Sequence, residues 1–352
     1  MPSYMREGST MKANPVVAVC GATGAVGQEF LKVLHDVDFP ASQVRALASA
    51  RSAGKQVEFE GCGQVPAGPI TIEEMTPESF QGVDIALFSA GSDVSKELRQ
   101  AVVDAGAVMI DNSSAFRMDD DVPLVVPEVN PEDVEWHKGV IANPNCSTIE
   151  MVVALAPLAK ISPIKRVVVS TYQAASGAGY PAMIELLEQT RAYLADEEMV
   201  AEKFAHPLAF NCIPRIDVMM EDGSTKEEWK MVAETQKIMH APNLGVNATC
   251  IRVPSIRCHG ESVNVEFESP VGVNQASMAL AFAPSVEVMD DPEQNVYPMP
   301  AMLTGKDYVY VGRLREDSSN PNALSFWLVM DQIRKGAALN AVQIAQLLLP
   351  KE

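Results

Sequence analysis

A short apolar run, a glycine-rich turn and a helical pattern follow one another near the start of this chain, and they restrict its fold more than any other feature. Residues 16–20 (VVAVC) favour a strand, and residues 21–27 (GATGAVG) precede apolar positions at helical spacing. Such glycines let the backbone approach a pyrophosphate at the helix N-terminus. The spacing departs from the common Gly-x-Gly-x-x-Gly fingerprint, so we expect a variant dinucleotide-binding turn; a glycine-rich turn without a ligand is the alternative. The expected contacts are Gly21, Thr23, Gly24, Ala25, Val26 and Gly27.

The rest of the N-terminal third repeats the alternation of strand and helix. We predict strands at 44–48, 85–89, 108–111 and 140–142, and a helix at 96–105. Strands that alternate with helices form a parallel sheet with helices on both faces. This part is therefore predicted to be an α/β, Rossmann-type dinucleotide-binding domain.

The pattern changes after residue 160, where longer β-type runs occur. These runs lie at 164–172, 249–253, 263–268 and 308–314. Helical stretches at 182–195 and 226–239 are expected to cover one face of a mixed or antiparallel sheet, and a last helix at 336–349 is expected to return to the first domain. A chain of 352 residues is expected to form two domains. We place them at 12–145 with 331–352, and at 146–330, the second being an α+β domain with a mixed sheet.

Charge and hydropathy exclude some partners. The net charge is −19, with 27 Lys and Arg against 46 Asp and Glu, whereas nucleic-acid binding depends on clustered basic residues. No apolar run reaches the roughly 18 residues of a membrane span, and residues 1–10 contain no hydrophobic segment of the signal-peptide type. We expect a cytoplasmic protein that binds neither nucleic acid nor membrane. Residues 1–10 lack periodicity, and we leave them out of the predicted fold.

The six cysteines are widely spaced and form no Cys-x-x-Cys pair, so neither a zinc site nor a disulfide framework is predicted. One of them stands apart by its context. Cys146 lies in residues 143–148 (NPNCST), between a proline and the helical run 149–158. Free backbone N–H groups and the macrodipole at a helix start favour a thiolate and can stabilise an oxyanion. A small buried hydrophobe is the alternative interpretation of this cysteine.

Polar and small residues follow several predicted strands. Arg51 and Ser52 come after the second strand, where a residue that distinguishes NAD from NADP is expected. They suit a 2′-phosphate, and no acid stands there to repel it; a solvated arginine is the alternative. Ser89 and Gly91 leave room for a nucleotide. Arg117 can clamp a phosphate or a carboxylate, although its segment also suits an ordinary polar turn.

Several segments, taken in order, resemble aspartate-β-semialdehyde dehydrogenase over roughly residues 12–350. The segments that carry the resemblance are 21–27 (GATGAVG), 51–54 (RSAG), 112–117 (NSSAFR), 143–148 (NPNCST), 171–179 (TYQAASGAG), 227–230 (EEWK), 252–254 (RVP) with His259, and 334–338 (RKGAA). The resemblance implies a catalytic and dimerisation role for the second domain. It also implies a homodimer or a dimer of dimers.

The resemblance further implies a role for each matching residue. Cys146 is expected to be the nucleophile, His259 the acid/base and Gln173 the group that orients the intermediate. Arg252 is expected to bind the substrate carboxylate and Glu227 its ammonium group. Phosphate is expected to contact Lys230, Arg117 and Asn145. Further contacts to NADP are expected from Ser176, Gly177 and Gln332, and no metal is implied.

The implied reaction is the reduction of L-aspartyl 4-phosphate by NADPH to L-aspartate 4-semialdehyde and phosphate, through a thioacyl enzyme at Cys146. Alternatives are N-acetylglutamyl-phosphate reductase, a glyceraldehyde-phosphate type dehydrogenase, and a nucleotide-binding paralogue without catalysis. One departure concerns the residues after His259, where Gly260-Glu261 replaces the more usual serine and leaves the support of the histidine open. Cys258 is expected to point away from the site, because successive strand residues face opposite sides.

Overall fold

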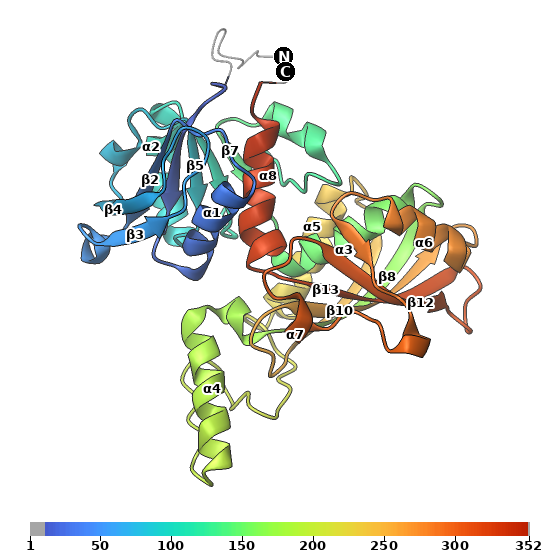
Figure 1. Ribbon diagram of the computed structural model, residues 1–352. Helices are drawn as coiled ribbons and strands as arrows, with labels where there is room; N and C mark the ends of the chain where they lie inside the picture. Colours follow the sequence, from blue (N-terminus) through green and yellow to red (C-terminus); the bar gives the residue numbers. More distant parts are fainter. Residues whose placement is uncertain (1–10, 351–352) are drawn as a thin grey trace. The chain divides into compact units, whose positions relative to one another are not determined.

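The computed structural model describes residues 11–350, which divide into two compact units (Figure 1). The first unit comprises, of the described residues, 11–144 together with 337–350. The second unit comprises Asn145–Gly336. Within the described residues no helix is long and apolar enough to cross a membrane.

The first unit is built on a seven-stranded sheet in the order β3-β4-β2-β1-β5-β6-β7, in which only β3 runs antiparallel to its neighbour. Its strands are β1 Val16–Cys20, β2 Gln43–Ala48, β3 Gln56–Phe59, β4 Gly68–Glu74, β5 Ile85–Phe88, β6 Val108–Asp111 and β7 Val140–Ala142. Its helices are α1 Ala25–Asp36, α2 Ser92–Asp104 and α8 Leu339–Leu347. The predicted strands and helices of this region are confirmed, but β3 and β4 were not predicted.

Side chains of the central strands point alternately to the two faces of the sheet, and helices cover each face. Val17, Val19 and Leu87 belong to one core cluster with apolar residues of α1 and α8. The other face is covered by α2, whose Ser95 donates a hydrogen bond to Asp111 at 2.7 Å. Helices therefore lie on both faces of a parallel sheet, as the alternation of strand and helix predicted.

The second unit contains a six-stranded mixed sheet in the order β11-β12-β13-β10-β8-β9. Its strands are β8 Ile164–Gln173, β9 Gly245–Arg252, β10 His259–Phe267, β11 Val286–Val288, β12 Val309–Glu316 and β13 Ala323–Met330. Its helices are α3 Cys146–Ala159, α4 Tyr180–Leu194, α5 Lys226–Ile238, α6 Val273–Ala281 and α7 Pro300–Leu303. The predicted mixed sheet is confirmed. The strand β13 was not predicted, because its apolar residues occupy both faces and show no alternation.

One helix of this unit is not where the sequence placed it. The prediction that both 182–195 and 226–239 cover the sheet holds for α5, which packs against β9 and α3, but not for α4. The helix α4 extends away from the sheet (Figure 1), and its Leu186 packs with Leu208 and Ile213 instead. Gln189 fixes the following segment by accepting hydrogen bonds from the backbone of Leu208 and Ala209. The helical pattern located the helix but could not show which surface it covers.

Candidate active site

The start of α3 is capped by the residue before the cysteine. Asn145 has an extended backbone, and its Oδ1 accepts hydrogen bonds from the backbone N–H groups of Ser147 and Thr148 at 3.0 and 3.2 Å. This is the arrangement of a strong N-cap. Cys146 is therefore the first residue of the helix, partly exposed, at the positive end of the macrodipole. The predicted setting for a thiolate is present.

A glycine that the sequence analysis did not select allows the cysteine its position. A Cβ added at Gly336 would lie 2.9 Å from the Cβ of Cys146 and 2.8 Å from the Cε of Met330. Carbon atoms do not approach so closely without displacement, so a side chain at 336 would push against the cysteine. The backbone of Gly336 therefore lies directly against Cys146.

A buried polar cluster centred on Glu227 lies beside this helix start. Its Oε1 accepts hydrogen bonds from Asn145 Nδ2 at 2.9 Å and from Gln173 Nε2 at 3.2 Å, and its Oε2 accepts one from Lys230 Nζ at 3.1 Å. Gln173 also donates to Ser147 Oγ at 2.9 Å. The cluster brings together four residues that the sequence analysis assigned to the site: Asn145, Gln173, Glu227 and Lys230.

The charges in this cluster stabilise one another. Burial alone would raise the pKa of Glu227, but Lys230, Asn145 and Gln173 lower it below its ordinary value. Burial likewise opposes the charge of Lys230, yet Glu227 and Asp217 raise its pKa, and Asp217 accepts a hydrogen bond from Nζ at 2.7 Å. Glu227 is therefore a carboxylate and Lys230 an ammonium group at neutral pH.

His259 lies at the start of β10 and is fully buried. The backbone N–H of Ala174 donates to its Nδ1 at 3.1 Å, which assigns the neutral ring a proton on Nε2. Burial first, and then the charge of Arg252, hold the pKa of His259 well below its usual value. Among the described residues Nε2 has no hydrogen-bond partner. The ring is thus neutral, with an available donor.

A second glycine keeps space open in front of the histidine. A Cβ added at Gly177 would lie 2.8 Å from Arg252 Nη1 and 3.2 Å from His259 Nε2. Arg252 itself donates to the carbonyl of Ala174 at 2.7 Å, and its guanidinium lies over the ring of Phe204. Burial lowers the pKa of Arg252, but an arginine remains charged at neutral pH. One cation and one neutral donor therefore border the same glycine.

The remaining expected residues of this unit form a hydrogen-bonded chain. Gln332 donates to Ser176 Oγ and accepts from the backbone N–H of Cys258 at 3.0 Å. The side chain of Cys258 is buried with Tyr310 and Val329. The residue precedes β10 and has a φ of 71°, so the alternation along a strand does not fix the direction of its side chain. Burial raises its pKa to about 12, so this thiol stays protonated.

In the first unit, the glycine turn lies at the carboxyl end of β1, between β2 and β5. A Cβ at Gly21 would lie 2.3 Å from Ser89 O, and one at Gly27 would lie 2.1 Å from Gly21 O, so only glycine fits at either position. Gly91 begins α2 with a φ of 92°. This edge is where the strand order reverses, the usual ligand site of an open α/β sheet.

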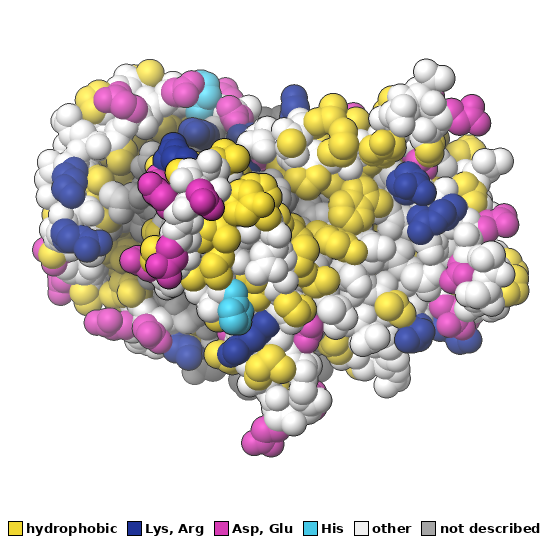
Figure 2. Space-filling model, turned by 90° about the horizontal axis from the view of Figure 1, so that it is seen from below, with side chains coloured by type: hydrophobic (Ala, Val, Ile, Leu, Met, Phe, Trp, Pro, Cys, Tyr) yellow, Lys and Arg dark blue, Asp and Glu magenta, His cyan; other side chains and the backbone are white. Residues whose placement is uncertain are grey.

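The two arginines of the first unit that the sequence analysis assigned to the site differ in their exposure to solvent. Arg51 is exposed in a short turn after β2, next to the buried Ser52. Arg117 is largely buried, and it donates to the carbonyl of Asn143 at 3.0 Å and to that of Asn112 at 2.8 Å. Asn112 is itself unusual, because both polar atoms of its side chain are buried without a partner among the described residues. On the face shown in Figure 2, basic side chains are scattered among acidic ones.

Three contributors to the site were missed by the sequence analysis. Glu234 on α5 accepts a hydrogen bond from the backbone N–H of Asn145 at 2.6 Å. Ser147 orients Gln173, and Gly336 admits Cys146. Ser147 was adjacent to the cysteine and Gly336 was part of a resembling segment, so both had a local signal. Glu234 had none, since it lies 89 residues from its partner.

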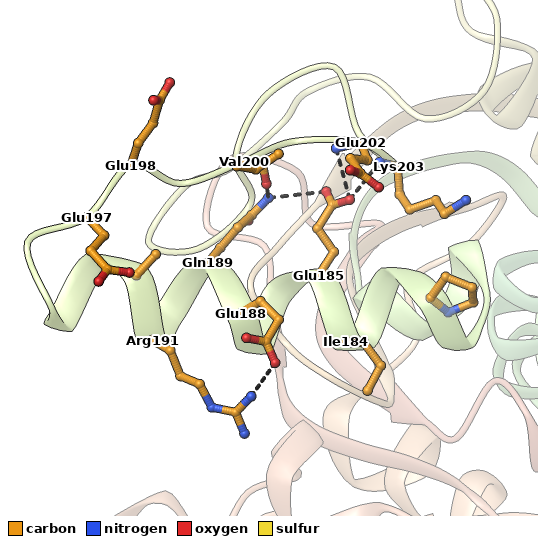
Figure 3. A pocket seen from close by; sticks show the side chains of 12 residues that line it. Ile184, Glu185, Glu188, Gln189, Arg191, Glu197, Glu198, Val200, Glu202 and Lys203 are labelled. Atoms are coloured by element: carbon orange, nitrogen blue, oxygen red, sulfur yellow. Dashed lines mark hydrogen bonds and ion pairs between the residues drawn. The ribbon is translucent and has the colours of Figure 1, made fainter.

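A groove of about 450 Å³ lies elsewhere in the second unit, along α4 and the segment that follows it (Figure 3). Acidic side chains dominate its lining, and Glu185 accepts hydrogen bonds from the backbone of Glu202 and Lys203. None of the residues assigned to the site lines this groove. Within residues 11–350, no group of three or more His, Cys, Asp or Glu is placed to hold a metal ion.

One unit has a sheet of the nucleotide-binding type, and a second, mixed-sheet unit has a helix that begins with a cysteine; this combination matches one class of enzyme. The family described as semialdehyde dehydrogenase, NAD binding domain, matches residues 16–137. Its companion, semialdehyde dehydrogenase, dimerisation domain, matches residues 155–335.

Individual relatives narrow the class. Aspartate-semialdehyde dehydrogenase from Aquifex aeolicus is 54% identical over 95% of this chain and 97% of its own, and that from Bacillus subtilis is 50% identical over 94% and 96%. The crystal structure of aspartate semialdehyde dehydrogenase II from Vibrio cholerae, complexed with ASA, superimposes with a TM-score of 0.91 at 43% identity, covering 95% of this chain and 98% of that one. The chain therefore belongs to the aspartate-semialdehyde dehydrogenases, oxidoreductases of amino-acid biosynthesis.

Proposed function

We propose that this enzyme reduces L-aspartyl 4-phosphate with NADPH, giving L-aspartate 4-semialdehyde and phosphate, in the pathway to lysine, threonine and methionine. The observation that carries the proposal is the set of residues around α3 in the second unit. A cysteine at the helix start, a neutral histidine with a free donor and a buried arginine are the groups that acyl transfer to a thiol requires.

In the first stage, the thiolate of Cys146 attacks the acyl carbon of the substrate. A bond forms between Sγ and this carbon, and the bond to the phosphate oxygen breaks, so that a thioester remains and phosphate leaves. The positive end of the α3 macrodipole stabilises the oxyanion. The side chain of Asn145 accepts hydrogen bonds from the backbone N–H groups of Ser147 and Thr148, which holds the first turn rigid.

In the second stage the thioester is reduced and the thiohemiacetal collapses. His259 holds its proton on Nε2, the side that borders Gly177, and donates a hydrogen bond through it to the oxygen of the intermediate, so the neutral ring stabilises the negative charge there and keeps its proton. Gln173 is neutral at every relevant pH and is fixed by Ser147 and Glu227, so it orients oxygen without changing charge. Collapse of the intermediate breaks its bond between carbon and Sγ, so that the aldehyde leaves and the cysteine is again a thiolate.

Substrate binding divides between positive and negative groups of the second unit. Arg252 binds the α-carboxylate, because a guanidinium matches a carboxylate with two parallel hydrogen bonds. Glu227 holds the ammonium group, and its lowered pKa keeps it charged for that purpose. Lys230 and Asn145 supply donors to the phosphate, and Arg117 of the first unit is proposed as a third contact.

The first unit fits a dinucleotide. A side chain at Gly21 or Gly27 would collide with backbone, so only glycine fits at these two positions, and Gly24 precedes α1 as an N-cap without a side chain. The N–H groups at the start of α1 can therefore hold a pyrophosphate. Gly21, Thr23, Gly24, Ala25, Val26 and Gly27 would surround the phosphates, with Ser89 and Gly91 nearby and Ser176, Gly177 and Gln332 from the second unit. NADPH, when bound, supplies the hydride.

The choice of NADP over NAD is proposed from Arg51 and Ser52, which follow β2 with no acid between them. The solved enzyme from Candida albicans, described with NADP, has a TM-score of 0.72 at 26% identity over 95% of this chain and 98% of its own, which supports this choice. Replacing Arg51 by Ala should raise the KM for NADP about tenfold or more, because a hydrogen bond to a charged group contributes about 1.5–3 kcal/mol. The KM for NAD should hardly change, and equal effects on both cofactors would remove the assignment.

The proposed activity is tested in the oxidative direction. Purified enzyme should reduce NADP with L-aspartate 4-semialdehyde only when phosphate is present, and N-acetylglutamate semialdehyde should be a poor substrate beside it. Comparable turnover of the N-acetylated substrate would favour the reductase alternative.

We also propose a cytoplasmic homodimer, with a dimer of dimers as the larger option. The dimerisation-domain match covers the mixed sheet, whose open face carries the exposed Tyr172 in edge contact with Trp327. Gly260 lies under that tryptophan, and a Cβ there would lie 2.5 Å from its ring. A second copy is the occupant expected on this face. Sedimentation of wild type and Tyr172→Glu should show loss of the dimer in the variant, and an unchanged mass would exclude this face.

A further inference from the structure

Two buried glutamates of the second unit play no part in the proposed mechanism. Glu150 on α3 and Glu261 on β10 are both fully buried. Among the described residues, none of their four carboxyl oxygens has a hydrogen-bond partner. An ionised carboxylate in such surroundings is strongly unfavourable, and a buried acid without donors keeps its proton instead.

Their places in the fold connect them to the reactive residues. Glu150 lies one helical turn after Cys146, on the same face of α3. Glu261 lies two residues after His259, on the same face of β10. The helix α3 packs against β10, and the charge of Glu150 acts on Glu261. The two carboxyl groups therefore join the element that carries the cysteine to the element that carries the histidine.

The charges around the pair do not neutralise it. Burial raises the pKa of both groups well above the ordinary value, and Glu150 raises that of Glu261 further. The nearby thiols, Cys250 and Cys258, are kept protonated mainly by their own burial. A protonated thiol is uncharged, so neither cysteine stabilises an ionised form of Glu150 or Glu261.

The charged groups on the packed elements have other partners or are exposed. On the neighbouring α5 and β9, the groups with partners are Glu227, Glu228, Lys230, Glu234, Lys237 and Arg252. Lys226 is exposed. The titratable residues of β8 and β12 lie mainly on exposed positions, and these residues are Lys165, Arg166, Tyr172, Tyr310, Arg313, Arg315 and Glu316. The described α6 and β13 contain no ionisable side chain.

We propose that Glu150 and Glu261 form a protonated carboxyl pair that ties the cysteine helix to the histidine strand and so positions Cys146 relative to His259. The positioning role rests on the proposed function; the existence of the pair does not. One carboxyl group donates its proton to the other, which satisfies oxygens that otherwise have no partner. Loss of both protons places two negative charges in the same buried space and disrupts the arrangement.

The pair is tested first without substrate, by infrared spectroscopy at neutral pH. The wild type should show the carbonyl band of a protonated carboxylic acid, and the double variant Glu150→Gln with Glu261→Gln should lack it. The exposed carboxyl of Glu188 on α4 gives the matched control, and Glu188→Gln should leave the band unchanged. Identical spectra of wild type and double variant would overturn the proposal, whatever substrate the enzyme uses.

The positioning role is tested by the pH profile of kcat. The double Gln variant keeps neutral, hydrogen-bonding groups of the same shape, so it should retain most of the activity and lose the alkaline inactivation that we expect of the wild type. Glu150→Leu leaves Glu261 without a partner and should lower kcat about tenfold or more. Circular dichroism checks that this variant folds; if it does not, the profile of the double Gln variant decides.

The possible results of these experiments distinguish the existence of the carboxyl pair, its positioning role and the proposed function. An alkaline limb that moves upward in the double Gln variant supports positioning through the shared proton. An infrared band without any change in the profile would overturn the positioning role. Failure of the enzyme to oxidise L-aspartate 4-semialdehyde would instead count against the proposed function, and it would leave the infrared result standing.

Discussion

Two sets of buried carboxyl groups border the same helix, and they differ in their partners. Glu227 accepts hydrogen bonds from Asn145, Gln173 and Lys230. Glu150 and Glu261 accept none from the described residues. Burial acts on all three in the same direction, but the pKa of Glu227 is lowered whereas those of Glu150 and Glu261 are raised. The difference shows that donors, and not depth, decide whether a buried carboxyl group of this enzyme is charged.

The two sets give the stability of the protein opposite pH dependences. The lowered pKa of Glu227 contributes stability above the unfolded value of about 4.3, and this contribution is lost as the pH falls through the folded pKa. The raised pKa values of Glu150 and Glu261 work the other way. Their contribution is present below about 4.3 and is lost as the pH rises through the folded values.

The largest effect is expected from Glu227→Leu, which removes the carboxylate that accepts hydrogen bonds in the buried polar cluster. The change leaves Lys230 with Asp217 alone and removes the acceptor of Asn145 and Gln173. Breaking one side of a buried charge pair costs about 3–5 kcal/mol of unfolding free energy, and kcat/KM should fall at least about 100-fold. Urea unfolding and steady-state kinetics measure the two quantities.

The matched control is Glu188→Leu, which breaks an i,i+3 pair with Arg191 on the exposed surface of α4. An exposed pair of this kind contributes about 0–1 kcal/mol, so both quantities should stay near the wild-type values. A loss at Glu188 as large as that at Glu227 would contradict the distinction between the two environments.

A smaller effect is expected from Asn145→Asp, which separates two tasks of one side chain. Aspartate keeps the cap oxygen for Ser147 and Thr148, but it replaces the donor to Glu227 by a second negative charge. Stability should fall by about 1–3 kcal/mol, since a hydrogen bond to a charged group is lost. The pKa of Glu227 should rise, which carboxyl NMR titration can follow. An unchanged pKa would show that Asn145 does not support the charge.

The smallest effect is expected from Glu227→Gln at low pH. Because the wild-type advantage at this position depends on a charged carboxylate, the difference in unfolding free energy between wild type and variant should shrink between about pH 7 and about pH 3. Urea midpoints across this range measure the change. A difference that grows on acidification would mean that the pKa of Glu227 is raised and would cancel the contrast with Glu150 and Glu261.

Much of the fold was predictable because its signals are local. The turn 21–27 contains its own glycines, and each of the five predicted strands of the first sheet is a short, largely apolar run. Signals that depend on distant packing were weaker. The sequence showed that 182–195 is helical but not that it leaves the sheet, since Leu186 packs on a segment that has no pattern of its own.

The site was predictable where the chemistry is local and not where distant residues supply it. The cap at Asn145 and the pair of Glu227 and Lys230 are visible in the sequence. The sequence does not show the hydrogen bond that Glu234 accepts from Asn145, nor that Glu150 lacks a hydrogen-bond partner among the described residues. Both depend on how α3 packs against α5 and β10. From the sequence alone, a glutamate in an apolar helix is assigned to the surface, and only the packing of the helix shows that this one is buried.

The nucleophilic role of Cys146 is the central claim, and intact-mass spectrometry of the enzyme with NADP and L-aspartate 4-semialdehyde in the absence of phosphate tests it most directly. Without phosphate the thioester has no acceptor, so one NADPH per active site should form in a burst, and the mass should increase by one aspartyl group. Addition of phosphate should release that mass and restore turnover. Cys146→Ala should show neither burst nor mass increase. A burst that persists in this variant, or an aspartyl group on another residue, would contradict the account.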